Sequence, residues 1–121
     1  ITTDIEGKYK VQSGSYRDNG SAQEEYAKYS VTIRKAAPGL FYISDLLGGY
    51  YDQGRGYGSQ YAMTGYIQLL SDNTIKLLSS HVDGFGDSLD SMENGKYNPE
   101  TGEISFDVAY AGQMTFHVIL K

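Results

Sequence analysis

The chain has 121 residues, of which 15 are acidic and 10 basic, so that its formal net charge is −5, and it contains no Cys. This length fits one domain, and the lack of Cys excludes a disulfide scaffold, a Cys-ligated zinc site and a thiol nucleophile. The scattered basic residues argue against nucleic-acid binding, which depends on clustered Lys and Arg, and no apolar run approaches the roughly 18 to 20 residues of a membrane-spanning helix.

The first five residues are predicted to be the remnant of a polar linker. The chain opens on Ile1 rather than Met and continues with polar residues. Such an opening indicates a segment of a longer polypeptide, so the lack of a leader or lipidation motif carries no information about its compartment. We expect residues 1–5 to be linker and residues 6–121 to form a single β domain.

Alternating apolar and polar residues predict β-strands through the rest of the chain. In the last 20 residues this period of two continues along two consecutive runs, which is typical of half-buried strands. The segment 21–28 fits either a short helical turn or a solvated hairpin loop. The expected strands cover residues 6–13, 28–36, 40–45, 60–70, 74–81, 93–98, 103–110 and 113–121.

Successive hairpins without a crossover helix predict an all-β antiparallel meander of about eight strands. Such strands either close into a small lipocalin-like barrel or fold as a two-sheet β-sandwich. We expect the barrel, because a closed meander leaves no exposed strand edge. The sandwich is the alternative.

Turn residues predict the register of three hairpins, whose loops are at 71–73, 98–102 and 111–113. The pairs expected from these loops are Ile67 with Leu77, Tyr97 with Ile104, and Phe106 with Val118. The last register also places Asp107 opposite His117 on the other face of the sheet. Because no third group accompanies them, we interpret these two residues as a surface pair and not as catalytic residues.

The segment 45–61, DLLGGYYDQGRGYGSQY, is the most unusual part of the sequence. It contains five Gly and four Tyr in 17 residues. Glycine permits tight turns, and tyrosine offers a flat apolar face with a hydroxyl at its tip, which suits stacking on sugar rings. The predicted ligand-binding residues are Tyr50, Tyr51 and Tyr57 for stacking, with Asp45, Asp52, Gln53 and Arg55 for sugar hydroxyls. The alternative is an irregular strand connection whose tyrosines cap one end of the fold.

A second unusual segment, 81–90, carries three carboxylates, followed by Glu93. Calcium binds oxygen ligands of this kind, but the spacing of Asp83, Asp87, Asp90 and Glu93 does not match an EF-hand. We interpret the segment as a solvated acidic loop in which Asp residues form turns. No nucleophile-elbow motif occurs either. The sequence therefore predicts no metal site, no cofactor and no catalytic residues.

Three segments that cover most of the chain share their pattern with a known family: GKYKV, LFYISDLLGGYYDQGRGYGSQYAMTGYIQLLSDNTIKLLSS and GKYNPETGEISFDVAYAGQMTFHVILK. They resemble the C-terminal β domains of surface lipoproteins from Bacteroides-type gut bacteria, whose genes often lie near glycan-uptake systems. The strand count is also similar to the calycin or lipocalin shape, with Tyr9 where those families favour Trp. The lipoprotein resemblance implies a preceding immunoglobulin-like domain, an upstream lipid anchor as the sole membrane attachment, and exposure on the outer membrane. It implies no activity.

Together these observations predict a non-catalytic surface domain of a bacterial lipoprotein. Its expected ligand is a neutral oligosaccharide bound by the 45–61 segment, because the acidic net charge disfavours an anionic glycan. The alternative is a structural spacer or protein-interaction domain without a small-molecule ligand. Exposure of Tyr50, Tyr51 and Tyr57 favours glycan binding, whereas their burial favours the spacer.

Overall fold

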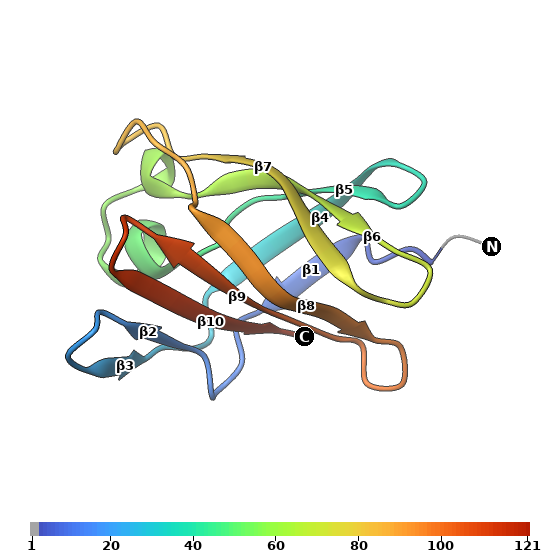
Figure 1. Ribbon diagram of the computed structural model, residues 1–121, viewed down its shortest axis with the longest axis horizontal. Coiled ribbons are helices and arrows are strands. Elements are labelled where there is room, and N and C mark those ends of the chain that lie inside the picture. The colour runs from blue at the N-terminus through green and yellow to red at the C-terminus, as the bar shows by residue number, and fades with distance from the viewer. Residues whose placement is uncertain (1–2) are drawn as a thin grey trace.

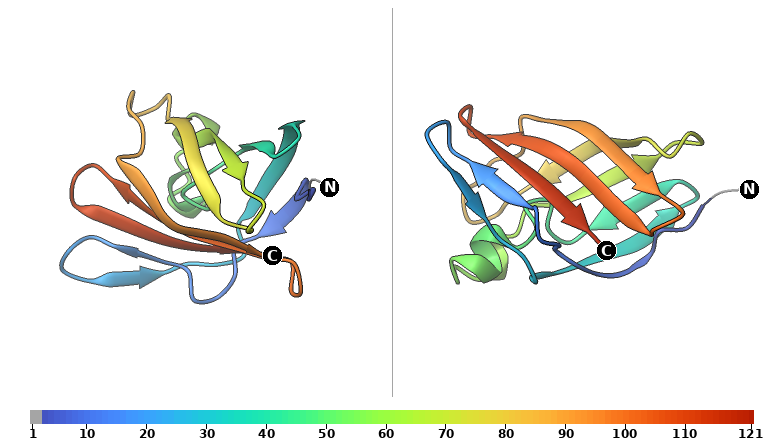
Figure 2. Two further views of the ribbon diagram at one scale, coloured as in Figure 1. Left: turned by 45° about the vertical axis from the view of Figure 1, so that its right-hand side comes forward. Right: turned by 90° about the horizontal axis from the view of Figure 1, so that it is seen from below.

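The computed structural model describes residues 3–121 and consists of two antiparallel sheets packed face to face (Figure 1). Residues 1 and 2, which belong to the predicted linker remnant, lie outside the described residues. Two turned views show the two layers and the short helical segments at one end of them (Figure 2). The all-β prediction is confirmed.

The first sheet has the strand order β1-β4-β5-β6-β7. Its strands are β1 (Gly7–Lys10), β4 (Ser30–Ala37), β5 (Leu40–Ile43), β6 (Thr64–Leu69) and β7 (Ile75–His81). Between β5 and β6 the chain forms a π-helical turn, η1 (Tyr50–Gly54), and a 3₁₀ turn, η2 (Ser59–Tyr61). Neither helical segment of the described chain is long and apolar enough to cross a membrane.

The second sheet has the strand order β3-β2-β10-β9-β8. Its strands are β2 (Tyr16–Asp18), β3 (Gln23–Glu25), β8 (Ser91–Asn98), β9 (Glu103–Tyr110) and β10 (Met114–Leu120). The β2–β3 hairpin falls in part of the chain where the sequence predicted no strand. The segment 21–28 therefore belongs to a hairpin, as one of its two interpretations proposed, and not to a helical turn.

The expected barrel is wrong, and the sandwich alternative is the observed arrangement. Within residues 3–121, isolated bridges and a few neighbouring backbone hydrogen bonds join the edges of the two sheets, near Thr74 and Lys96 on one side and near Val11 and Leu120 on the other. A bulge between Glu93 and Lys96 interrupts β8 next to the first bridge. Because a bulge bends its strand and increases the local twist, β8 turns away from β7 and no continuous ladder closes the sheet.

The topology also departs from a simple meander at its beginning. Consecutive hairpins do connect β4 to β7 and β8 to β10, but β1 pairs with β4, and β2 pairs with β10. The chain thus changes sheets after β1 and changes back after β3. All three predicted registers are confirmed, including Phe106 opposite Val118 and Asp107 opposite His117.

The core lies between the sheets and contains the apolar face of each predicted strand. Phe41, Phe106 and Phe116 are its largest fully buried rings. Among the residues of the three predicted pairs, Leu77 is only partly buried and packs against the margin of the core. The core continues into the connection between β5 and β6, where Leu46, Leu47 and the first two tyrosines of the 45–61 segment are buried.

Candidate functional site

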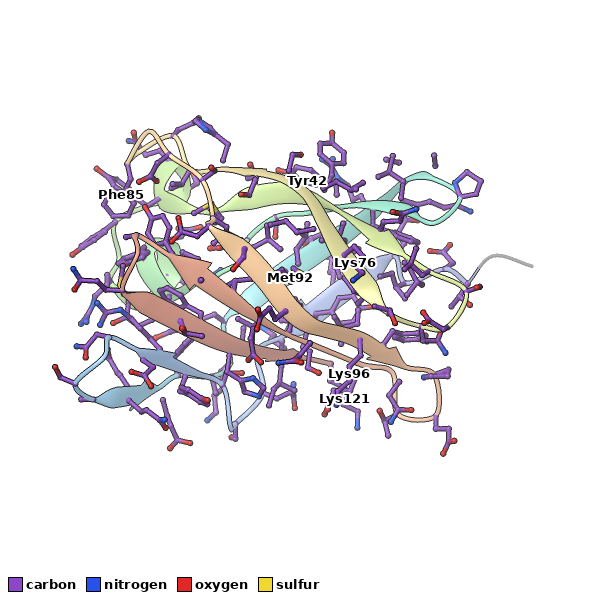
Figure 3. All side chains as sticks on the ribbon, in the orientation of Figure 1. Tyr42, Lys76, Phe85, Met92, Lys96 and Lys121 are labelled. Atoms are coloured by element: carbon purple, nitrogen blue, oxygen red, sulfur yellow. The ribbon has the colours of Figure 1, made fainter. Side chains whose placement is uncertain are left out.

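Aromatic side chains from three segments gather at one end of the sandwich, where η1 and η2 meet the turn between β7 and β8 and the end of β9. We call this cluster the aromatic end and define it as Tyr51, Tyr57, Tyr61, Phe85 and Tyr110. Each of its rings lies within 6.3 Å, between centroids, of at least one other. Figure 3 labels Phe85 at this end, next to the loops that carry the cluster.

Asp45 anchors the connection that carries η1 and η2. Its Oδ1 accepts hydrogen bonds from the backbone N–H groups of Leu47 at 2.9 Å and Met63 at 3.1 Å, so one carboxyl group joins the two ends of the connection. Its Oδ2 is buried without a hydrogen-bond partner among the described residues. Burial raises the pKa of Asp45 to about 7. This carboxyl is therefore a structural anchor and does not reach solvent to bind a sugar hydroxyl.

Tyr50 and Tyr51 point into the core and not into solvent. Their exposed fractions are 3% and 9%, and the Phe116 ring packs against both. The Tyr50 hydroxyl donates a hydrogen bond to the carboxylate of Glu24 on β3 and accepts one from Arg55 at 2.6 Å. These two rings hold the Tyr/Gly-rich segment on the sandwich, as the capping alternative proposed.

Three rings remain at the surface of the aromatic end. Tyr57 and Phe85 are 51% and 42% exposed, and Tyr61 lies half-buried between them. The Tyr57 ring stacks on Tyr51 with 15° between their planes, and about half of its surface remains exposed. The Tyr61 ring is steeply inclined to both exposed rings, at 71° to Tyr57 and 74° to Phe85.

The turn that carries Phe85 is fixed by close contacts. The Gly84 N–H donates to the carbonyl of Gln60, and the Gly84 backbone lies so close to the Tyr61 ring that a Cβ there would come within 2.5 Å of it. The buried Tyr110 hydroxyl donates to Asp87 at 2.7 Å. The exposed rings are therefore held by backbone and core contacts on both segments.

Of the remaining predicted site residues, Gln53 is exposed and exchanges hydrogen bonds with the backbone of Ser30 on β4. Asp52 is half-buried in η1, and Arg55 is exposed, forms an ion pair with Glu24 at 3.3 Å and lies over the Tyr50 ring. Sequence reasoning missed Tyr61 and Phe85 as site residues. A signal for Phe85 was present, because an isolated aromatic residue between two glycines in an acidic turn has no core role that explains it.

The carboxylates of the acidic segment 81–90 interact with separate partners and not with one another. Asp83 pairs with His81 at 3.0 Å, and Asp90 accepts a hydrogen bond from the Gly112 N–H. Within residues 3–121, no group of three or more His, Cys, Asp or Glu side chains is arranged to hold a metal ion.

The Asp107 and His117 side chains form the expected pair on the outer face of the second sheet. His117 Nδ1 lies 2.5 Å from Asp107 Oδ1, and Asn94 donates to the other carboxylate oxygen at 2.8 Å. Tyr16 packs against the imidazole ring with 5.3 Å between centroids. These cross-strand contacts are those of an ordinary surface pair.

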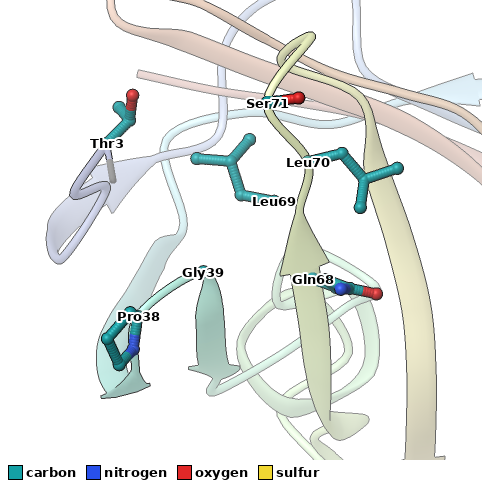
Figure 4. Close-up of a pocket in the computed structure, with 7 residues that line it drawn as sticks. All are labelled: Thr3, Pro38, Gly39, Gln68, Leu69, Leu70 and Ser71. Carbon is teal, nitrogen blue, oxygen red and sulfur yellow. The ribbon is translucent and has the colours of Figure 1, made fainter. Parts of the chain in front are cut away.

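A shallow pocket of about 260 Å³ lies at the opposite end of the first sheet, lined by Thr3, Pro38, Gly39, Gln68, Leu69, Leu70 and Ser71 (Figure 4). None of these seven residues is charged or aromatic. The pocket therefore offers neither a stacking surface nor a charge to orient a ligand, and the aromatic end is the stronger candidate.

Comparisons with known proteins identify related domains. A family model described as a C-terminal domain matches residues 1–121. The crystal structure of the lipoprotein BT2262 from Bacteroides thetaiotaomicron superposes with a TM-score of 0.93 at 46% identity. The match covers 99% of this chain and 61% of that one, so the present chain spans less than two thirds of its relative. No curated protein matches the chain.

Proposed function

The chain belongs to the family of lipoprotein C-terminal domains typified by BT2262, and from this premise we propose that it is a non-catalytic domain that binds a neutral oligosaccharide at its aromatic end. A lipoprotein relative from Bacteroides indicates a membrane-anchored surface location. The finer arrangement that we propose has an immunoglobulin-like domain and a lipid anchor upstream, and this domain outside the outer membrane.

The observation that carries the proposal is the pair of exposed rings at positions 57 and 85. Large aromatic side chains that remain half-exposed yet fixed in orientation are typical of binding surfaces, because they offer contact area without a large loss of side-chain entropy. Sugar rings carry C–H groups on their faces and hydroxyls around their edges. They therefore match an aromatic face with polar side chains nearby, and the segment that carries Tyr57 also carries Asp52 and Arg55.

Charge at the aromatic end favours a neutral ligand. The turn around Phe85 contributes Asp83 and Asp87, and the protein as a whole carries a net charge of −5. Arg55 is already paired with Glu24, so it offers little uncompensated positive charge to an anionic sugar. Repulsion by the acidic turn then disfavours uronate or sulfated glycans.

One observation favours the second candidate function, a structural spacer or protein-interaction domain. The burial of Tyr50 and Tyr51 shows that half of the tyrosines in the 45–61 segment serve the core. If all the aromatic residues of this segment packed in the core, their presence would be explained without a ligand. The exposed faces of Tyr57 and Phe85 favour a binding surface over a plain spacer, because core packing does not explain them.

The test is a panel of neutral and charged oligosaccharides titrated into the domain and followed by NMR and calorimetry. A single stacking surface of this size predicts Kd values near 10⁻³ to 10⁻⁴ M, on the order of −4 to −5.5 kcal/mol. We expect Tyr57→Ala and Phe85→Ala each to weaken binding about tenfold or more. Tyr66→Ala is the matched control, because this ring is 41% exposed but lies on β6, where it packs against Tyr42.

Two results would refute glycan binding at the aromatic end. The first is the absence of chemical-shift changes with every member of the panel, which would support the spacer or protein-interaction domain instead. The second is binding that survives the double substitution of Tyr57 and Phe85, which would place the glycan site elsewhere on the domain.

A further inference from the structure

The two exposed rings of the aromatic end face different directions. Tyr57 lies within 15° of the Tyr51 plane, and Tyr51 is inclined at 78° to Phe85, so the exposed rings are close to perpendicular. Tyr61 lies between them, with its centroid 5.4 Å from that of Tyr57 and 4.9 Å from that of Phe85. The three rings, which we call the notch, lie at steep angles to one another and do not form a flat platform.

This angle constrains the shape of a ligand that uses both exposed rings. A sugar stacks best when its face is parallel to the aromatic face. A ribbon-like glycan, such as a β1,4-linked glucan, presents successive sugar faces in nearly parallel planes, so a flat row of coplanar rings suits it. Perpendicular rings suit a chain whose neighbouring sugars turn relative to one another, as they do in a coiled α1,4-linked glucan.

The notch cannot readily flatten to fit a ribbon. The Tyr57 ring stacks on Tyr51, and the Tyr51 ring in turn packs against the buried Phe116 ring. Phe85 is held by the contact of Gly84 with the Tyr61 ring and by the neighbouring hydrogen bond of Tyr110 to Asp87. Preorganised walls of this kind discriminate by shape, because moving them would disrupt core packing.

Resting on the proposed glycan-binding function, we propose that the aromatic end selects a twisted glycan chain over a flat, ribbon-like one. In this arrangement one sugar stacks on Tyr57 and a neighbouring sugar, turned with the chain, packs on Phe85. A ribbon engages only one of the two rings at a time.

The experiment compares two linear glucose oligosaccharides of equal length, one α1,4-linked and the other β1,4-linked, titrated into the 121-residue protein by NMR and calorimetry. The two ligands have the same composition and charge, so the comparison isolates chain shape. We expect the α1,4-linked chain to bind about tenfold tighter, which corresponds to about 1.4 kcal/mol. Phe85→Ala should bring the two affinities together, because it leaves Tyr57 as the main stacking surface, whereas Tyr66→Ala should preserve the difference.

The outcomes separate this inference from the function on which it rests. Equal affinities, tighter binding of the β1,4-linked chain or no binding of the α1,4-linked chain would each overturn the shape selection. Binding of some other neutral glycan at Tyr57 would in that case leave the proposed function standing. Failure of the whole panel would overturn both.

Discussion

Asp45 is a carboxylic acid buried in the core, and replacing it with asparagine tests how the 45–61 connection is anchored. The amide oxygen of the introduced side chain can still accept the backbone hydrogen bonds of Leu47 and Met63, so the geometry of the anchor is preserved. The substitution removes the ionisable group. It also places an N–H₂ group where Oδ2 has no partner among the described residues, which adds a cost that does not depend on pH.

The magnitude follows from the difference between the folded and unfolded pKa values of Asp45. Burial raises its pKa from the ordinary 3.8 to about 7, so between these values the folded protein binds a proton more readily than the unfolded chain. The free energy of unfolding therefore falls as pH rises through this window, by about 1.4 kcal/mol per pH unit. By neutral pH the free energy of unfolding of the parent has fallen by a total on the order of 4 kcal/mol. The Asp45→Asn variant does not undergo this decrease.

The assay is urea unfolding of both proteins from about pH 4 to pH 8, followed by circular dichroism, with the stabilities compared at each pH. Subtracting the two curves cancels the titration of all other groups. We expect the stability of Asp45→Asn relative to the parent to rise steadily towards pH 7 and then level off. Glu100→Gln, at an exposed turn, is the matched control for the loss of one carboxyl group. Parallel curves for Asp45→Asn would refute the assignment of a raised pKa to this carboxyl.

Three other changes probe the core, the notch and the outer face. Phe116→Ala removes a fully buried ring and should lower the free energy of unfolding by about 3 to 5 kcal/mol in urea, whereas Phe116→Leu should cost clearly less. Gly84→Ala should displace the Tyr61 ring and weaken glycan binding about tenfold by NMR, while Gly7→Ala, whose nearest contact is at 3.7 Å, should not. His117→Gln should change stability by less than about 1 kcal/mol and leave glycan binding unchanged, and loss of a substrate-processing activity would contradict its assignment as a surface residue.

The sequence predicted the strands and registers wherever a local pattern determines them. Alternation located eight strands, and the loop before Met114 was enough to pair β9 with β10 correctly. The β2–β3 hairpin was missed because its three-residue strands carry mostly polar side chains and leave no apolar period. The choice between barrel and sandwich depends on a non-local contact. A Cβ at Gly95 would lie 2.3 Å from the carbonyl oxygen of Ile75, so the two backbones touch at one point where β8 bends away.

The sequence predicted where the candidate site lies but not which side chains form it. The density of Tyr and Gly located one wall of the aromatic end, yet a single π-helical turn of five residues is too short for a sequence period to tell which ring faces the core. Tyr50 and Tyr51 turn inward because Phe116, far along the chain, provides their packing surface. The opposite wall, with Phe85, comes from a different loop, and only the tertiary structure brings the two together.

The strand order of the second sheet has a consequence for how the domain folds. β10, the last strand in the chain, lies between β2 and β9 and pairs with both. The sheet cannot assemble from the N-terminus onwards as the polypeptide emerges, because its central strand arrives last. Pairing β2 with β10 joins residues from opposite ends of the chain, and the entropy lost in closing a loop of that length slows folding. Until this pairing forms, the edges of β2 and β9 stay open. In a nascent or translocating chain, the edges of β2 and β9 that face β10 therefore remain unpaired until Leu120 is available.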